Sequence, residues 1–212
     1  MINFNDESGE IDRSLGLKVT EIEARLLNKA RKILPEGNHH VWGEALHGGN
    51  QTWVGLHPET IQTPYQELKD ICEYLDPKPE ERVVDLGAGY GRLGFTLASL
   101  YPESHFLGIE FVKERVQEGS RIFESLKKPD LCLISGDLTD SSFELPQGEY
   151  YFIYDFGKVP HIRSILQKFS SLADQKRFIL VARGKGIRSL IVNEFHWLIE
   201  VQRKENYSIY QG

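Results

Sequence analysis

The sequence predicts an α/β fold, a doubly wound and mostly parallel seven-stranded sheet that ends in an antiparallel hairpin and follows an N-terminal extension. Five short apolar runs alternate with helical stretches between residues 82 and 182, which is typical of parallel strands whose connecting helices cover both faces of the sheet. Two strand-like runs, at 195–202 and 207–210, are joined by polar residues and indicate the hairpin. At 212 residues and 40% apolar composition, the chain can bury a full core as one domain with an extension.

Residues 1–60 are expected to form this extension, which comprises a helix and a lid. Residues 1–18 are polar and mixed in charge, so we expect them to be ordered poorly or only through contact with the domain. Apolar residues at helical spacing predict an amphipathic helix over 20–34, with Thr20 as its cap. Residues 38–63 combine tryptophan, glycine and proline with four histidines, which is typical of a structured loop or lid. The histidines are His39, His40, His47 and His57.

Residues 61–212 are expected to form the sheet domain. Thr63 and Pro64 open a helix that runs to Leu75, because proline is favoured in the first turn of a helix. The stretch 184–194 leaves room for only a short last helix. Strands are expected at 82–86, 106–110, 131–135, 149–155 and 177–182, and helices at 91–101, 112–127 and 158–172.

A glycine-rich turn directly after the first strand is the most informative segment of the chain. Residues 83–94 read Val-Val-Asp-Leu-Gly-Ala-Gly-Tyr-Gly-Arg-Leu-Gly, in which Gly87, Gly89 and Gly91 alternate. Glycine lets the backbone adopt a positive φ and approach a ligand closely. Residues 89–94 also satisfy the dinucleotide pattern Gly-x-Gly-x-x-Gly. The segment therefore predicts a nucleotide-type cofactor site, for either a dinucleotide or S-adenosyl-L-methionine.

Asp85 favours one of these two cofactors over the other. A dinucleotide binds through its pyrophosphate to free N–H groups at a helix N-terminus, where a neighbouring carboxylate is unfavourable. S-adenosyl-L-methionine carries an ammonium and a sulfonium instead, and a carboxylate beside the turn suits its cationic amino-acid end. Asp85 lies two residues before the first glycine, which favours the methyl donor.

Two further acids follow the next two strands. Glu110 ends the run 106–110, at the position where a carboxylate binds the ribose hydroxyls of either cofactor. Asp137 follows the run 131–135, where it can accept a hydrogen bond from an adenine amino group. Three strand ends therefore carry three acids.

These segments resemble the class I, seven-strand S-adenosyl-L-methionine-dependent methyltransferases, which have a Rossmann-like fold. The similarity covers roughly residues 60–212, and its most specific motif is the run 83–94. Gly108-Ile109-Glu110 and the run 135–138 match two later motifs of that family. The resemblance implies that the protein binds S-adenosyl-L-methionine and transfers its methyl group. The implied cofactor-binding residues are Asp85, Gly87, Ala88, Gly89 and Gly91 around the methionine part, Glu110 at the ribose and Asp137 near the adenine.

The reaction centre is expected at the carboxyl ends of the first and fourth strands. The fourth strand ends in Tyr154-Asp155-Phe156-Gly157, where base-directed N-methyltransferases carry an Asn/Asp-Pro-Pro-Tyr tetrapeptide. Asp155 could accept a hydrogen bond from an amine, and the rings of Tyr154 or Phe156 could attract a cation. Asp155 and Tyr154 are therefore the candidate catalytic residues. The alternative is that Asp155 caps the helix that begins near residue 158 and that the rings belong to the core.

The segment from Thr60 to Tyr65, followed by a helix and the glycine turn, is similar to seven-strand protein-lysine methyltransferases. That resemblance implies that Thr63 and Tyr65 contact the cofactor and that the acceptor is a protein lysine or another amine. A helix cap with an apolar staple would use the same residues. Three alternative functions stay open: a small-molecule methyltransferase, a non-catalytic cofactor-binding module and a short NAD-binding oxidoreductase.

Bulk properties constrain the partners. A net charge of −6 and a pI near 5.7 disfavour indiscriminate binding to a phosphate backbone, so the expected partner is a protein or small-molecule methyl acceptor, and nucleic acid is unlikely. The sequence has neither a signal-peptide pattern nor an apolar run near about eighteen residues, which predicts a cytoplasmic protein without membrane insertion. The histidines lack helical His-x-x-x-His spacing, so no metal site is expected. The oligomeric state stays open.

Overall fold

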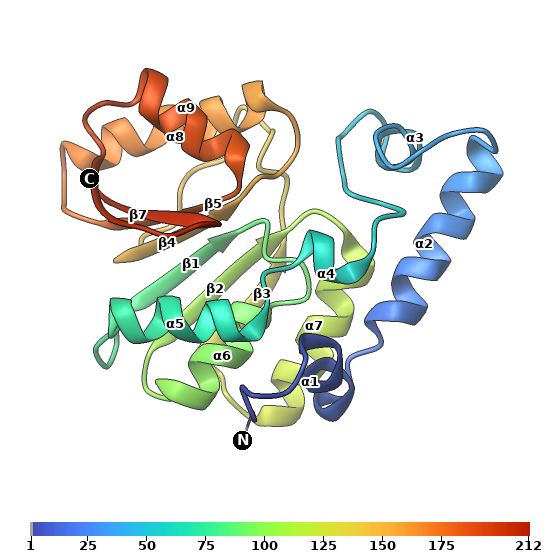
Figure 1. The fold of residues 1–212 in the computed structure, drawn as a ribbon, viewed down its shortest axis with the longest axis horizontal. Coiled ribbons are helices and arrows are strands. Elements are labelled where there is room, and N and C mark those ends of the chain that lie inside the picture. The colour runs from blue at the N-terminus through green and yellow to red at the C-terminus, as the bar shows by residue number, and fades with distance from the viewer. Residues whose placement is uncertain (1) are drawn as a thin grey trace.

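The computed structural model describes residues 2–212, which are organised around a seven-stranded sheet (Figure 1). The strand order is β3-β2-β1-β4-β5-β7-β6. The first five strands pair in parallel, and β7 pairs antiparallel with both β5 and β6. The strands are β1 (Arg82–Leu86), β2 (His105–Glu110), β3 (Leu131–Ser135), β4 (Tyr150–Tyr154), β5 (Ile179–Arg183), β6 (Ile199–Arg203) and β7 (Tyr207–Gln211). The predicted fold class is confirmed, including the antiparallel hairpin.

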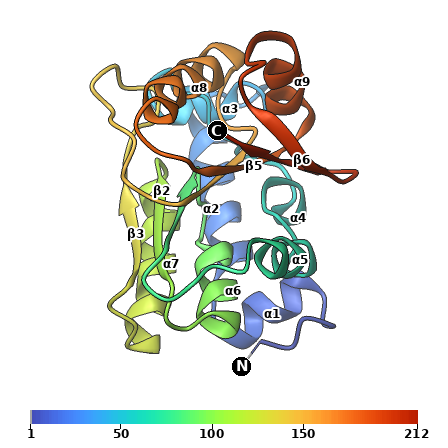
Figure 2. The ribbon, with the colours of Figure 1, turned by 90° about the vertical axis from the view of Figure 1, so that its left-hand side faces the viewer.

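Both faces of the sheet are buried, which explains why its central strands are largely apolar. Val83 enters one hydrophobic core and its neighbour Val84 enters the other. Figures 1 and 2 show that the helices divide between these two faces. The first core contains side chains of α5 (Tyr65–Leu75), α6 (Arg92–Leu100) and α7 (Lys113–Leu126), and the second contains those of α8 (Val159–Ala173) and α9 (Lys185–Glu194).

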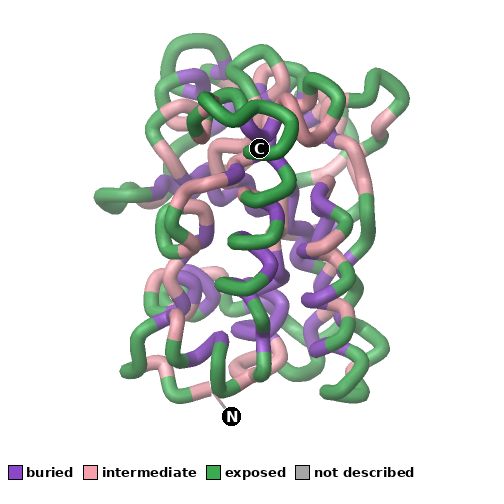
Figure 3. The backbone as a smooth tube through the Cα atoms, turned by 90° about the vertical axis from the view of Figure 1, so that its right-hand side faces the viewer, coloured by how far each residue is buried: buried purple, intermediate pink, exposed green. Residues whose placement is uncertain are grey.

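The N-terminal extension packs on the first core and carries four helices, α1 (Ser8–Leu15), α2 (Val19–Ile33), α3 (Trp42–Leu46) and α4 (Pro58–Ile61). Residues 1–18 were expected to be poorly ordered or to be ordered only through contact with the domain. The helix α1 lies in this range and contacts the domain, since Ile11 is buried in the first core. Figure 3 views the molecule from the side of α2 and shows exposed outer turns over a buried interior. The expected Thr20 cap is wrong: Lys18 occupies the N-cap position, and its N–H donates to Glu118 Oε1 at 2.8 Å.

Two buried ion pairs join the extension to the sheet domain. Arg92, at the start of α6, binds Asp12 of α1 with nitrogen–oxygen distances of 2.5 and 3.2 Å. Arg115 of α7 binds Glu23 of α2 at 2.8 and 3.1 Å. Both pairs are bidentate, a geometry that gives strong and directional charge-assisted hydrogen bonds. The extension is therefore tied to the two helices that flank the glycine turn.

Element boundaries differ from expectation mainly near the C-terminus. The hairpin strand expected to start at 195 begins at Ile199, because Phe195 is buried at the end of α9. The last helix, α9, reaches ten residues. Within residues 2–212, no helix combines the length and the apolar composition needed to cross a bilayer.

Candidate active site

The glycine turn after β1 is held in shape by its own hydrogen bonds. Gly87 and Gly89 both have positive φ angles, of 93° and 58°. The N–H groups of Gly87 and Ala88 donate to the carbonyl of Ile109 at 2.9 and 3.0 Å, and the N–H of Gly89 donates to Glu110 Oε2 at 2.9 Å. A Cβ atom added to Gly89 would meet nothing within 4 Å, so this part of the turn presents its backbone to open space.

Gly91 serves the packing of the fold. It occupies the N-cap of α6 with φ 85°, and an added Cβ would approach the Phe123 ring to 2.8 Å. The residue is not part of the lining of the two cavities described below, and its contact with Phe123 belongs to the packing of α6 against α7.

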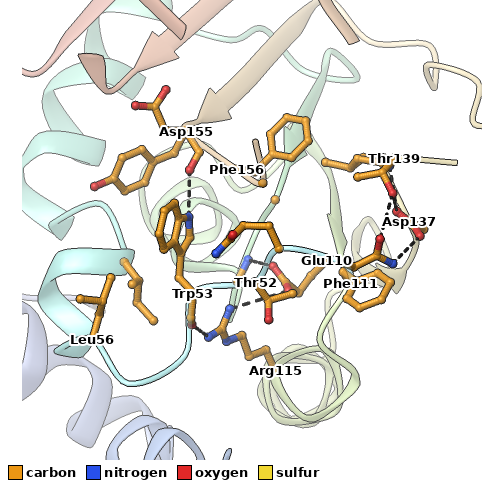
Figure 4. Close-up of a pocket in the computed structure, with 18 of the residues that line it drawn as sticks. Thr52, Trp53, Leu56, Glu110, Phe111, Arg115, Asp137, Thr139, Asp155 and Phe156 are labelled. Atoms are coloured by element: carbon orange, nitrogen blue, oxygen red, sulfur yellow. Dashed lines mark hydrogen bonds and ion pairs between the residues drawn. The ribbon is translucent and has the colours of Figure 1, made fainter. Parts of the chain in front are cut away.

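Two adjoining cavities lie at the carboxyl ends of β1, β2 and β4, where open α/β sheets bind ligands. Figure 4 shows residues that line the larger one. The larger has a volume of about 310 Å³ and the smaller about 30 Å³. Their walls share Ile61, Gly87, Gly89 and Tyr154, so the two cavities are direct neighbours.

The three predicted acids all line this site. Glu110 and Asp137 face the larger cavity, and Asp85 faces the smaller one. The second oxygen of Glu110 accepts the N–H of Val112 at 2.8 Å, so this carboxylate is fixed by two backbone donors. Asp137 accepts hydrogen bonds from Thr139 N–H and Thr139 Oγ1 at 2.8 and 2.6 Å.

Asp85 is the most strongly perturbed of these acids. Its side chain is buried, with 6% of the residue exposed. Burial, together with the negative charge of Glu110, raises the pKa of Asp85 to about 8. The group is therefore largely protonated near neutral pH, and a cationic ligand beside it would favour its ionised form.

The predicted lid forms one wall of the larger cavity. Asn50 Nδ2 donates to Asp137 Oδ2 at 3.0 Å, and Trp53 Nε1 donates to the carbonyl oxygen of Asp155 at 3.2 Å. Arg115 Nη2 donates to the carbonyl of Trp53 at 2.6 Å. Hydrogen bonds therefore hold the segment to the ends of β3 and β4 and to α7. The residues in each bond are more than 60 positions apart in the chain, so local sequence patterns do not reveal these contacts.

The histidines of this segment have structural contacts. The rings of His39 and His40 contact each other at a tilt of 42°, with centroids 4.0 Å apart, and His57 Nδ1 accepts the N–H of Glu59 at the start of α4. His47 Nδ1 lies 2.7 Å from Thr52 Oγ1, and burial followed by the charge of Arg115 lowers the pKa of His47. Across residues 2–212, no cluster of three or more His, Cys, Asp or Glu side chains has a metal-binding arrangement.

Tyr154 and Phe156, from the end of β4, lie with Trp53 in the wall of the larger cavity. The Tyr154 hydroxyl donates to the carbonyl of Thr60 at 2.9 Å, and the guanidinium carbon of Arg183 lies 4.2 Å from the centre of its ring. The cavity therefore has an aromatic region next to the glycine turn.

Asp155 has a different role from the one expected. Its carboxylate accepts the N–H groups of Gly186 and Ile187 at 2.8 and 2.7 Å, and so caps the first turn of α9. Figure 4 shows this carboxylate pointing away from Trp53. The alternative named the helix near residue 158, and this is wrong, because the helix that Asp155 caps is α9. Both oxygens are engaged, which leaves the carbonyl of Asp155 as its contact with the lid.

Thr63 and Tyr65 lie in different surroundings in the structure. Thr63 lines the smaller cavity. Tyr65 is fully buried beneath α1, where its hydroxyl donates to Asp12 Oδ1 at 3.0 Å and its N–H donates to Ser8 Oγ at 3.0 Å. The expected cofactor contact of Tyr65 is therefore wrong, because the ring faces the N-terminal helix. Gln62, which the sequence did not single out, lines the smaller cavity instead.

The polar groups of the site can be compared with each candidate cofactor. The N–H groups of Gly87, Ala88 and Gly89 are all bonded to protein oxygens, so the turn offers no free donors from these residues to a pyrophosphate. Glu110 can accept hydrogen bonds from a ribose diol, and the carboxyl of Asp85 suits an ammonium group. The residues present fit S-adenosyl-L-methionine better than a dinucleotide.

Comparisons with known proteins agree with this fit. Residues 77–184, just over half of the chain, match the family described as "Methyltransferase domain". The chain is 31% identical over 71 residues to the rRNA N(6)-adenosine-methyltransferase metl-5 of Caenorhabditis elegans, which is 33% of each protein. It is 30% identical over 88 residues to O-methyltransferase 4 of Dictyostelium discoideum, 42% of this chain and 24% of that one. The matches thus span a third or less of these curated relatives.

The crystal structure of an RNA methyltransferase from Salinibacter ruber in complex with S-adenosyl-L-homocysteine has a similar fold. The two superimpose with a TM-score of 0.53 and 17% identity, over 71% of this chain and 91% of that one. The region matched by the family runs from the residues before β1 to the end of β5 and includes the whole glycine turn. The chain belongs to the methyltransferase domain family and has the class I, Rossmann-like fold of S-adenosyl-L-methionine-dependent methyltransferases.

Proposed function

We propose that this protein uses S-adenosyl-L-methionine to methylate an amine nitrogen, and that a protein lysine is the favoured acceptor. The observation that carries the choice of an amine is the aromatic region formed by Trp53, Tyr154 and Phe156 beside the glycine turn. Aromatic walls exclude water and can accommodate an alkylamine without a competing hydrogen-bond acceptor.

The chain's own residues would hold the cofactor across the two neighbouring cavities. Glu110 would bind the ribose hydroxyls, Asp137 would lie at the adenine, and Asp85 would contact the ammonium group. When bound, the cofactor supplies an electrophilic methyl group on its sulfonium. The fixed carboxylate of Glu110 needs no reorganisation on binding, because Gly89 and Val112 already orient it.

The aromatic part of the cavity, where the acceptor would bind, favours the neutral form of an amine. Only the deprotonated amine has a lone pair for methyl transfer, and a lysine has an ordinary pKa of about 10.4. Desolvation by the aromatic walls disfavours the ammonium form. The carboxylate of Asp155 is hydrogen-bonded to α9, so Asp155 would act by positioning α9 and the lid. Of the two candidate catalytic residues, Tyr154 is therefore the one whose side chain would contact the acceptor.

Isotope transfer tests this proposal. The protein is incubated with source-cell lysate and S-adenosyl-L-methionine carrying a labelled methyl group, with the Glu110→Ala variant as the matched control. The proposal predicts label that resists ribonuclease, is released by protease and appears as methyl-lysine after acid hydrolysis, and that is missing with the variant. Label confined to nucleic acid would contradict it.

A small-molecule amine is the second candidate. The hydrogen bond from Trp53 of the lid to the carbonyl of Asp155 makes the lid part of the cavity wall, a feature that would suit a small acceptor. Label in the low-mass fraction would favour this candidate. The sequence led us to expect that nucleic acid is not the acceptor. The relatives do not support that expectation, because the Caenorhabditis elegans protein is named as an rRNA methyltransferase. Separating protein, RNA and low-mass fractions therefore distinguishes all three acceptor classes.

A further inference from the structure

Glu23 is a buried acid of the N-terminal extension that binds two side chains beside the glycine turn. Only 5% of the residue is exposed. Its Oε1 accepts hydrogen bonds from the Tyr90 hydroxyl and from Arg115 Nε, both at 2.8 Å, and its Oε2 accepts Arg115 Nη2 at 3.1 Å. Tyr90 belongs to the glycine turn itself. The helix α2 therefore contacts the cofactor-binding segment, although it lies outside residues 77–184, which the family match covers.

Arg115 also faces a second carboxylate, that of Glu110. Its Nη1 lies 3.9 Å from Glu110 Oε1, and the two side chains are 7% and 9% exposed. A charge-assisted hydrogen bond between these groups would be about 2.8 Å long, so a movement of about 1 Å would form it. An unpaired guanidinium in the interior is strongly unfavourable, so Arg115 pairs with a carboxylate within its reach. Glu23 and Glu110 therefore compete for the same cation.

This competition matters because Glu110 has few free acceptor positions. A carboxylate has about four lone-pair positions. Two of them are in use, because Oε1 accepts the N–H of Val112 and Oε2 accepts the N–H of Gly89. The two that remain match the two hydroxyl groups of a ribose. A hydrogen bond from Arg115 to Oε1 would take one of them.

We propose that Glu23 is a positioning residue of the cofactor site, which holds Arg115 away from Glu110 and so leaves the free acceptor positions of Glu110 to the ribose hydroxyls. Glu23 is not part of the lining of either cavity, so it acts through Arg115. The inference rests on the proposed function, because it concerns binding of the same cofactor. It gives the N-terminal extension a part in the recognition of the ribose.

Two ligands test the assignment without any acceptor. S-adenosyl-L-homocysteine carries both ribose hydroxyls, and its 2′,3′-dideoxy analogue lacks them, so the ratio of the two dissociation constants measures the ribose selectivity. Glu23→Gln removes the charge but keeps an oxygen that can accept from Tyr90 and Arg115, and circular dichroism checks that the fold persists. Calorimetry should show that this variant binds S-adenosyl-L-homocysteine about tenfold more weakly, an effect of about 1.4 kcal/mol, and the analogue within about twofold of wild type.

A double variant separates competition for Arg115 from a purely structural role of Glu23. Glu23→Gln combined with Arg115→Met replaces both charged groups by neutral ones, so no unpaired charge is left in the interior. Glu110 then has no competitor from Arg115, and the ribose selectivity should return to within about threefold of wild type. Loss of the Arg115 hydrogen bond to the lid would affect both ligands alike and leave this ratio unchanged. The double variant therefore decides the question even if Glu23→Gln alone is unstable.

Glu21→Gln is the matched control, because Glu21 is exposed on the same helix. It should leave both affinities unchanged. Equal weakening of both ligands in Glu23→Gln, no weakening of either, or a double variant without ribose selectivity would overturn the role of Glu23. Wild-type protein that bound both ligands equally would do the same. If the wild-type protein bound neither ligand, the proposed function itself would be overturned, which separates the two failures.

Discussion

Asp85 combines a buried position with a predicted ligand contact, and its protonation couples folding to pH. Its pKa is raised from 3.8 to about 8 in the folded protein, so the folded state holds a proton that the unfolded chain releases above about pH 4. The stability that Asp85 contributes is complete below about pH 4 and is lost as the pH rises toward 8.

The Asp85→Asn variant should remove this dependence. Asparagine keeps the shape and cannot ionise, so the difference in unfolding free energy between variant and wild type should grow in favour of the variant between pH 4 and pH 8. Denaturant unfolding across that window measures the difference. A constant difference would mean that Asp85 has an ordinary pKa. The variant should also lose affinity for S-adenosyl-L-homocysteine, because it no longer offers a negative charge to the ammonium.

Glu110 is the second residue on which the site depends. Its two oxygens organise the glycine turn through Gly89 and the start of α7 through Val112. Glu110→Gln keeps the size of the side chain but has one acceptor oxygen and no charge. We expect binding of S-adenosyl-L-homocysteine to weaken by about tenfold or more with the fold retained, by calorimetry and circular dichroism. The control is Glu114→Gln, since Glu114 pairs with Lys29 outside the larger cavity.

At the scale of elements, α9 depends on the end of β4. The carboxylate of Asp155 caps α9, and an added Cβ on Gly184 would approach Asp155 Oδ2 closely. Asp155→Ala should therefore destabilise the protein by about 1 kcal/mol, the usual effect of losing an N-cap. Asp155→Asn keeps one acceptor oxygen and should retain methyl transfer. Loss of transfer in a stably folded Asp155→Asn variant would restore Asp155 as a catalytic acid or base.

The attachment of α1 is a second element-scale property. Asp12 and Arg92 are both nearly fully buried, with side chains 5% and 4% exposed. Asp12→Ala leaves the guanidinium without its bidentate partner and should reduce the unfolding free energy by about 3–5 kcal/mol. The control on the same helix is Glu10→Ala, which breaks an exposed pair with Arg13 and should cost less than about 1 kcal/mol. Similar losses in both variants would show that α1 is only loosely attached.

At the scale of the whole molecule, local patterns predicted the sheet well. Apolar runs that carry Asp85 and Glu110, each followed by a helical stretch, were enough to predict a parallel sheet with its connecting helices. Contacts between distant segments were not predictable. The partner of Tyr65 is Asp12, 53 residues away, and the lid is fastened by Arg115, 62 residues beyond Trp53. Nothing in local periodicity encodes such pairs, because they depend on how finished helices pack.

The central claim is that this site binds the adenosyl-methionine cofactor and not a dinucleotide. Calorimetric titration of the wild-type protein with S-adenosyl-L-homocysteine and, separately, with NAD tests it directly. We predict saturable binding of S-adenosyl-L-homocysteine that Glu110→Gln weakens, and no binding of NAD, because the N–H groups of Gly87, Ala88 and Gly89 are already bonded. Binding of NAD alone, or of S-adenosyl-L-homocysteine with unchanged affinity in Glu110→Gln, would contradict the account.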